Sequence, residues 1–293
     1  MVPAQTSCKA GHGLIANRCP NDETAMEQLD LGHHIYLMLL DNRLFLAPIA
    51  PDPQNVLDIG TGTGIWAIDF ADSWPSAQVI GTDLSPIQPT CVPPNVLFEI
   101  DDAAEEWTFP KESFDYIHVR GLFGSLRDWP AFYRQVLAHL KPGGYYEQME
   151  CSVYCHAEDG TSPPGSPLRR WGELFNEAGI RTGKTVNVID HQYQWLKDAG
   201  FEDVREHRFR MPDGPWPSAR TEQGKKLKEI GRLRLLEVET GMEGWSMALF
   251  TRVLGMSYEE VQLFLLEMRK AWRDKREHGF TRVGVVYGRK PLT

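Results

Sequence analysis

Residues 55–83 read NVLDIGTGTGIWAIDFADSWPSAQVIGTD and carry three glycines at alternate positions, Gly60, Gly62 and Gly64. A short apolar run precedes them, and a helical pattern begins at Ile65. Glycine lets the backbone turn tightly and lets a ligand approach it closely, and the first turn of the next helix offers free N–H groups. The stretch therefore predicts a ligand-binding loop at the carboxyl end of a strand in an α/β sheet.

The spacing of these glycines separates two kinds of ligand. The dinucleotide fingerprint G-x-G-x-x-G would place a third glycine at position 65, which is isoleucine, so the spacing speaks against a nicotinamide oxidoreductase. An acid, Asp58, stands two residues before the first glycine, where it disfavours a pyrophosphate. A ligand with an ammonium group and a sulfonium fits better, because Asp58 can hold the amino group directly or through water. Gly64 then lets the helix pack closely on the strand.

The rest of the chain alternates short apolar segments with helical patterns, which favours a mostly parallel sheet covered by helices on both faces. Strands are expected at 56–59, 79–82, 96–100, 116–119, 145–150, 204–211 and 281–289. Helices are expected at 22–45, 65–74, 131–140, 171–178, 188–199, 221–240 and 257–277. Asp22 or Thr24 can cap the first helix, and the GlyMetGluGly run at 241–244 is expected to break the helical pattern before it.

Charge and composition restrict the partners. The net charge is −9, and the first hundred residues hold 3 basic and 11 acidic side chains, which disfavours nucleic acid. No apolar run approaches the roughly 18 residues of a membrane helix, so no membrane association is expected. The five cysteines form an odd count without a CxxC pair, which favours free thiols in the cytoplasm, with the nucleus as the alternative. Nothing in the sequence suggests a catalytic metal.

The acid followed by GxGxG resembles the first motif of the class I S-adenosylmethionine-dependent methyltransferases. The resemblance continues in order through VIGTDLS at 79–85, FEIDDA at 98–103 and FDYIHVRG at 114–121. It implies that Asp83 binds both ribose hydroxyls, that Leu84 packs on the adenine, and that Asp101 or Asp102 meets the adenine amino group. It also implies a Rossmann-like fold with a seven-stranded, mostly parallel sheet, whose seventh strand at 282–287 is antiparallel.

A closer resemblance is to the LaeA-like methyltransferases of filamentous fungi, which accompany secondary-metabolite pathways. It rests on RLFLAP at 43–48, on GTGTGIWAIDFAD and on the HVRG…DW…LKPGGYYEQME series, and it is dense from about residue 22 to 151. Cys151 departs from the aromatic or polar residue that usually follows QxE in that family. We expect an irregular arm at 1–20 and a single methyltransferase domain at 21–293. Within it, residues 21–48 would form a helical lid and residues 213–278 a helical cap inserted before the last strand.

The predicted site has three parts. The cofactor set comprises Tyr36, Asp58, Gly60, Thr61, Gly62, Gly64, Asp83, Leu84, Asp101, Asp102, Ala103, Arg120 and Gly121. Arg120 would hold the cofactor carboxylate or a substrate acid, with a structural salt bridge as the alternative. Candidates for substrate contacts are His33, His191, Met242 and Trp245. Candidates for a general base are His34 and Glu150, because the lid and the end of the fifth strand border the transfer site in related folds.

These features predict an S-adenosylmethionine-dependent methyltransferase that modifies a hydroxyl or carboxyl oxygen of a small secondary metabolite. Tryptophans crowd the chain after residue 170, which favours an aromatic or polyketide-like substrate. Two alternatives stay open. One is a nuclear regulatory protein that acts with a velvet-type partner, and the other is a protein of the same fold that catalyses a rearrangement or cyclisation. A homodimer is compatible with each of these readings.

Overall fold

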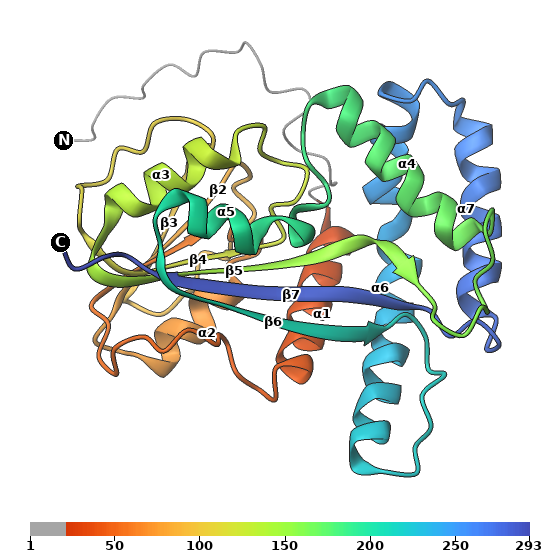
Figure 1. Ribbon diagram of the computed structural model, residues 1–293, viewed down its shortest axis with the longest axis horizontal. Coiled ribbons are helices and arrows are strands. Elements are labelled where there is room, and N and C mark those ends of the chain that lie inside the picture. The colour runs from red at the N-terminus through yellow and green to blue at the C-terminus, as the bar shows by residue number, and fades with distance from the viewer. Residues whose placement is uncertain (1–21) are drawn as a thin grey trace.

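The computed structural model describes residues 22–293, so the arm expected at 1–20 lies outside the described residues. A seven-stranded sheet has the order β3-β2-β1-β4-β5-β7-β6 (Figure 1). Its strands are β1 (Asn55–Ile59), β2 (Gln78–Asp83), β3 (Val96–Ile100), β4 (Phe114–Arg120), β5 (Leu140–His156), β6 (Glu202–Pro212) and β7 (Phe280–Arg289). Strands β1 to β5 pair in parallel, and β7 is antiparallel to both β5 and β6. The predicted fold, with its antiparallel seventh strand, is confirmed.

Helices cover both faces of this sheet and extend beyond one end of it (Figure 1). They are α1 (Glu23–Leu39), α2 (Ile65–Ser73), α3 (Trp129–His139), α4 (Pro167–Thr182), the 3₁₀ turn η1 (Val188–Asp190), α5 (Gln192–Ala199), α6 (Glu222–Arg252) and α7 (Tyr258–Arg273). Asp22 caps α1, as predicted, because its carboxylate accepts the N–H of Ala25.

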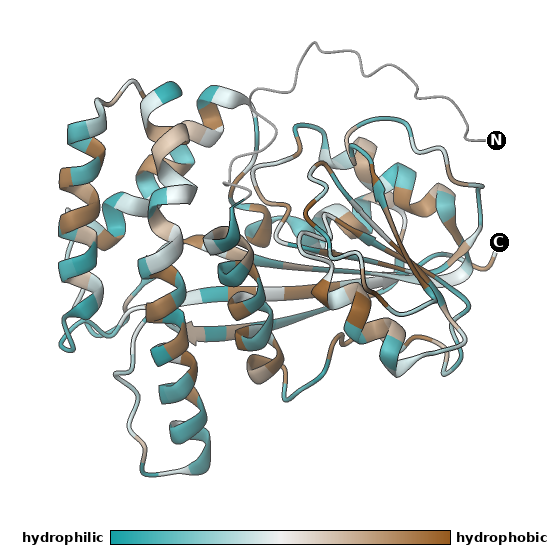
Figure 2. Cartoon of the chain, turned by 180° about the vertical axis from the view of Figure 1, so that it is seen from behind, coloured by the Kyte–Doolittle hydropathy of each residue, from teal (hydrophilic) through white to brown (hydrophobic). Residues whose placement is uncertain are grey.

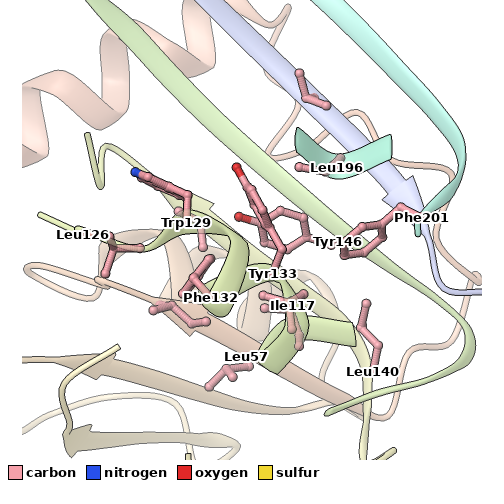
Figure 3. Packing of buried hydrophobic residues seen from close by; sticks show 14 of the residues in the cluster. Leu57, Ile117, Leu126, Trp129, Phe132, Tyr133, Leu140, Tyr146, Leu196 and Phe201 are labelled. Carbon is pink, nitrogen blue, oxygen red and sulfur yellow. The ribbon is translucent and has the colours of Figure 1, made fainter. Parts of the chain in front are cut away.

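Two hydrophobic cores lie on opposite faces of the central strands. Alternate residues of a strand point to opposite faces, so Leu57 packs with α3 and α5 while Val56 packs with α2. The first core is rich in aromatic rings (Figure 3), which include Trp129, Phe132, Tyr133, Tyr146 and Phe201. With both faces covered, β1 and β4 are held firmly, and the residues at their carboxyl ends have fixed positions.

A further core joins α4, α6 and α7 beyond the end of the sheet. Its buried side chains include Trp171 and Phe175 of α4, Met242 and Phe250 of α6, and Phe264 of α7. Hydrophobic and hydrophilic positions alternate along these helices (Figure 2), as expected for helices with one buried side. Helices α6 and α7 are inserted between β6 and β7, so this core is tied to the sheet at both ends of the insertion.

The predicted break at residues 241–244 is wrong, because α6 runs without interruption from Glu222 to Arg252. Gly241 is required by side-chain packing and not by a turn. A Cβ atom at Gly241 would lie 2.4 Å from Cζ2 of Trp245, one helical turn further on. The glycine therefore lets the indole ring lie flat across the helix.

The first helix also differs from its prediction, since α1 ends at Leu39 and not near residue 45. Asp41 and Asn42 follow in the left-handed region, with φ of 57° and 59°, and the chain reverses there into an extended segment, 43–48. Asp and Asn tolerate this conformation better than most residues. The apolar residues after them continue the helical spacing, which is why the pattern predicted a longer helix.

Segment 43–48 is anchored to the sheet by one buried carboxylate. Glu147 of β5 accepts the backbone N–H groups of Leu46 at 2.8 Å and Ala47 at 2.6 Å. From the other side, Trp66 of α2 donates its indole N–H to the carbonyl oxygen of Leu44 at 2.9 Å. Because the carboxylate is fully buried, desolvation raises the pKa of Glu147 to about 7 despite these hydrogen bonds.

This pKa gives stability a defined dependence on pH. Between about pH 4.5 and 7 the folded protein binds the Glu147 proton more tightly than the unfolded chain does, so stability falls as pH rises through this window. We expect Glu147→Gln, which stays neutral, to lose roughly 3 kcal/mol less stability than the wild type between about pH 5 and 8. Urea unfolding at the two pH values measures this difference.

Glu99→Gln, at an exposed position on β3, serves as the control and should keep the wild-type dependence. Parallel stability curves for Glu147→Gln and the wild type would contradict the role given to Glu147.

Candidate active site

A cavity of about 890 Å³ opens at the carboxyl ends of β1, β2 and β4 and continues between α1 and α6. Its first part, which we call the glycine-loop end, is lined by residues 60–63, 82–85 and 101–104. Its second part, the helical end, is lined by side chains of α1, α4, α6, α7 and β5. Eleven of the predicted cofactor residues line the cavity: Tyr36, Gly60, Thr61, Gly62, Asp83, Leu84, Asp101, Asp102, Ala103, Arg120 and Gly121.

The glycine loop adopts a conformation that only glycine takes easily. Gly60, Gly62 and Gly64 have φ of 70°, 59° and 82°, which lie in the left-handed region. A Cβ atom at Gly64 would lie 2.2 Å from the Phe98 ring of β3, so this glycine serves the close packing expected of it and does not line the cavity. The loop thus turns its backbone toward the cavity at residues 60–63.

Asp58 supports the loop from below and does not line the cavity. Its Oδ2 accepts the hydroxyl of Thr61 at 2.6 Å, and its Oδ1 accepts Nδ1–H of His118 at 2.7 Å. Burial lowers the pKa of His118, and its neutral ring stacks on Trp66 with ring centroids 3.8 Å apart. Because Asp58 does not line the cavity, the structure does not support the expected direct contact with a ligand amino group, and contact through water stays a prediction.

Acidic side chains line the rest of the glycine-loop end. Asp83, at the end of β2, accepts the N–H groups of Gly62 and Ser85, both at 2.9 Å. Burial still raises the pKa of Asp83, because the carboxylate is removed from water. Asp101 and Asp102 each accept a backbone N–H close in sequence, at 2.9 Å, which orders the loop after β3.

Arg120, at the end of β4, connects the sheet to α1. Its guanidinium lies 3.1 Å from Nδ1 of His33, whose Nε2 lies 2.9 Å from the carboxylate of Asp69 on α2. His33 therefore accepts at Nδ1 and donates at Nε2. The guanidinium also lies over the ring of Tyr36, 5.4 Å from its centroid. Within residues 22–293, no carboxylate comes within 4 Å of Arg120, so the structural salt bridge considered as an alternative does not form.

The helical end contains a polar group that the sequence analysis missed. Arg234 donates to Glu237 at 2.7 Å, both on α6, and Gln28 of α1 bridges Glu237 at 3.3 Å and the indole N–H of Trp245 at 3.2 Å. A charged i, i+3 pair usually indicates a solvated helix surface. Their position in the sequence could have indicated that they are buried, because Arg234 and Glu237 share a helix face with the apolar residues Ile230 and Val238.

Besides Asp58 and Gly64, four predicted residues do not line the cavity: His34, His191, Met242 and Glu150. His34 is exposed on α1, and His191 is exposed where η1 ends, against the ring of Trp195. Met242 is fully buried in the core of α4, α6 and α7. The structure does not support these three predictions, because the residue type and its place in the chain do not tell which side of an element faces the cavity.

Glu150, the other predicted base, faces the protein interior. Its carboxylate accepts the N–H groups of Leu122 and Phe123 and the side-chain amide of Gln148, each at 3.1 Å. Burial raises the pKa of Glu150 to about 7, yet its side chain does not line the cavity. It positions the loop after β4 and is not placed to take a proton from a ligand in the cavity.

The part of the chain from residue 22 onward contains neither a metal site nor a membrane-spanning helix. There, no three His, Cys, Asp or Glu side chains gather in a way that could hold a metal ion. Over the same residues, no helix is both long and apolar enough to cross a membrane.

Comparisons with known proteins agree with this arrangement. Residues 31–206 match the family model of a methyltransferase domain. The chain is 39% identical over 283 residues to the methyltransferase pytC of Aspergillus terreus, covering 96% of this chain and 86% of pytC. It is 33% identical over 278 residues to the secondary metabolism regulator LAE1 of Cochliobolus heterostrophus, covering 93% and 89%.

The fold has a counterpart among solved structures. A chain in the complex between the Haloferax volcanii Trm112 methyltransferase activator and a methyltransferase matches with a TM-score of 0.53 and 14% identity, covering 92% of this chain and 96% of that one. At this identity the match concerns the fold alone. Taken with the family model and the fungal relatives, it leads to one conclusion: the chain belongs to the class I S-adenosylmethionine-dependent methyltransferases, in the group that includes pytC and the LaeA-like proteins of fungal secondary metabolism.

Proposed function

We propose that the protein transfers a methyl group to a hydroxyl or carboxyl oxygen of a small, flat secondary metabolite. The observation that supports this proposal is one cavity that joins two unlike ends. The glycine-loop end is acidic and rich in backbone N–H groups, whereas the helical end is lined by the rings of Trp171, Phe175, Trp245 and Trp272. The methyl donor and a flat acceptor would meet where the two ends join.

The glycine-loop end fits S-adenosylmethionine, which would supply an electrophilic methyl group on a sulfonium. In this proposal Asp83 binds the ribose hydroxyls, and Asp101 or Asp102 accepts from the adenine amino group. Leu84 is 41% exposed where it lines the cavity, which suits a flat ring packed on it. Arg120, without a carboxylate partner among the described residues, is suited to hold the carboxylate of the methionyl part.

The helical end would orient the acceptor. Aromatic walls offer a large contact area to a flat molecule and restrict how it can lie. Methyl transfer is an in-line displacement, so holding the acceptor oxygen in line with the methyl group is the main contribution that such walls can make. Orientation of this kind is worth up to roughly 7–11 kcal/mol of the barrier.

A second candidate function is regulation through a protein partner. LAE1, which is 33% identical over 93% of this chain, carries the name of a secondary metabolism regulator. A velvet-type protein is the candidate partner, and the nucleus would then be the site of action. A third reading, rearrangement or cyclisation in the same cavity, would consume no methyl donor.

Calorimetry with S-adenosylhomocysteine tests the cofactor site. We expect Asp83→Ala to weaken binding by at least about tenfold, because a charged hydrogen-bond acceptor for the ribose is lost, and to lower Tm, because the N–H groups of Gly62 and Ser85 lose their acceptor. Asp58→Ala should weaken binding and also lower Tm, since it removes the buried support of the loop.

Asp72→Ala, at an exposed position on α2, is the matched control and should bind as the wild type does. Unchanged binding by Asp83→Ala would contradict the assignment of this site.

Transfer of a labelled methyl group separates the three functions. Incubation of the protein and labelled S-adenosylmethionine with extracts of small metabolites should give a labelled ether or ester. A converted metabolite without label would indicate rearrangement. No labelled or converted product, together with co-purification of a velvet-type protein, would support the regulator instead.

A further inference from the structure

The titratable and charged side chains at the helical end come from several elements. They are His33 and Tyr36 of α1, Arg120 of β4, Cys151 and Cys155 of β5, Lys184 of the loop after α4, and Arg234 and Glu237 of α6. A neutral alcohol or phenol would need one of them to accept its proton before or during methyl transfer. The bonding of each group decides whether it can do so.

Groups that carry a firmly held proton are unsuited to this task. Burial raises the pKa of Tyr36 well above its usual value, raises that of Cys151 to about 11, and raises that of Cys155 well above its usual range. The phenol and both thiols are therefore protonated near neutral pH. They therefore do not accept the proton of a ligand.

The two remaining acceptors are already engaged. His33 accepts from Arg120 at Nδ1 and donates to Asp69 at Nε2. Glu237 accepts from Arg234 at one oxygen and from Gln28 at the other. Protonation of either group would break a buried charge-assisted contact.

Arg234 has more N–H groups than its hydrogen bond to Glu237 uses. Its side chain is only 12% exposed, and its Nε–H has no hydrogen-bond partner within residues 22–293; the nearest carboxylate oxygen, of Asp213, is 3.8 Å away. The guanidinium lies over the Trp245 ring, 5.8 Å from its centroid. The buried Nε lies beside Asp213, which does not line the cavity, so an oxygen of a molecule in the cavity would meet the guanidinium at its other N–H groups.

We infer that the substrate is a flat conjugated acid, a carboxylic acid or its vinylogous equivalent, that enters as an oxyanion, and that Arg234 is the residue that recognises it. This inference rests on the proposed function. An ionised oxygen needs no base, which agrees with a cavity end whose possible proton acceptors are all engaged. Glu237 already balances the single positive charge of Arg234. The positive charge that would balance the substrate oxyanion is therefore that of the sulfonium of the methyl donor.

The transfer step then involves no proton. The ionised oxygen forms the new O–C bond with its own electron pair, while the electrons of the C–S bond go to sulfur. The products are a neutral ester or enol ether and a neutral thioether. Arg234 and the aromatic walls hold the oxygen in line.

Binding of defined probes tests this inference. Two flat acids, 4-hydroxy-6-methyl-2-pyrone and 2-naphthoic acid, are titrated into the full chain saturated with sinefungin, an unreactive analogue of S-adenosylmethionine that has a cationic amine near the position of the sulfonium, beside their neutral O-methyl derivatives. We expect at least one acid to bind at least about tenfold more tightly than its derivative, and Arg234→Met to abolish the difference. Arg232→Met, on the exposed side of the same helix and paired with Glu229, should keep it.

The controls separate this inference from the proposed function. Each variant is first shown to bind S-adenosylhomocysteine as the wild type does, and failure of the wild type at that step would count against the proposed function itself. If the wild type is loaded but both acids bind no better than their neutral derivatives, the inference is overturned. A loss of preference in Arg232→Met equal to that in Arg234→Met would also overturn it.

The pH dependence of methyl transfer by the wild type gives a second test. The single-turnover rate of methyl transfer to whichever acid binds should be nearly constant between about pH 6.5 and 8.5, since the acid is ionised throughout. Transfer to 3,5-dimethylphenol should be much slower and should rise with pH. Equal rates for both acceptors, rising together through neutral pH, would reveal an enzyme base and contradict the inference.

Discussion

Two backbone N–H groups, of Leu46 and Ala47, donate to one buried carboxylate, Glu147, and this contact fixes where the chain after α1 meets the sheet. The position of α1 follows from it, because segment 43–48 leaves little freedom at the end of the helix. From there α1 reaches the glycine loop through the contact of Asp30 with Thr63 at 2.6 Å, and it reaches α6 through Gln28. The cavity is closed on one side by a helix whose place depends on one buried carboxyl group.

The two ends of the cavity are built by different physical means. At the glycine-loop end, backbone conformation matters most, and side chains such as Asp58 and Asp83 hold the loop by hydrogen bonds to it. At the helical end, side-chain packing matters most. Close approach is made possible there by two glycines, because a Cβ atom at Gly32 would lie 2.9 Å from Glu237 and one at Gly241 would lie 2.4 Å from Trp245.

Two buried glutamates of β5, Glu147 and Glu150, have a structural role. Glu147 and Glu150 both have a pKa raised to about 7, a value often associated with proton transfer, yet both are engaged with backbone N–H groups that order nearby segments. A raised pKa alone therefore does not identify a catalytic acid or base in this fold. An acid with a structural role is distinguished from a possible catalytic acid or base by whether its side chain lines the cavity.

The sequence by itself determined the strands, their order of appearance and the glycine loop, because these depend on local properties: alternation, β-branched residues and the positive φ that Gly60, Gly62 and Gly64 adopt. It also identified thirteen residues that line the cavity, the eleven of the cofactor set together with His33 and Trp245. Only the tertiary structure decided the end of α1, the unbroken course of α6, and the burial of Arg234 and Glu237. These depend on contacts between segments far apart in the chain: Gln28 lies 209 residues before Glu237, and no local spacing encodes such a contact.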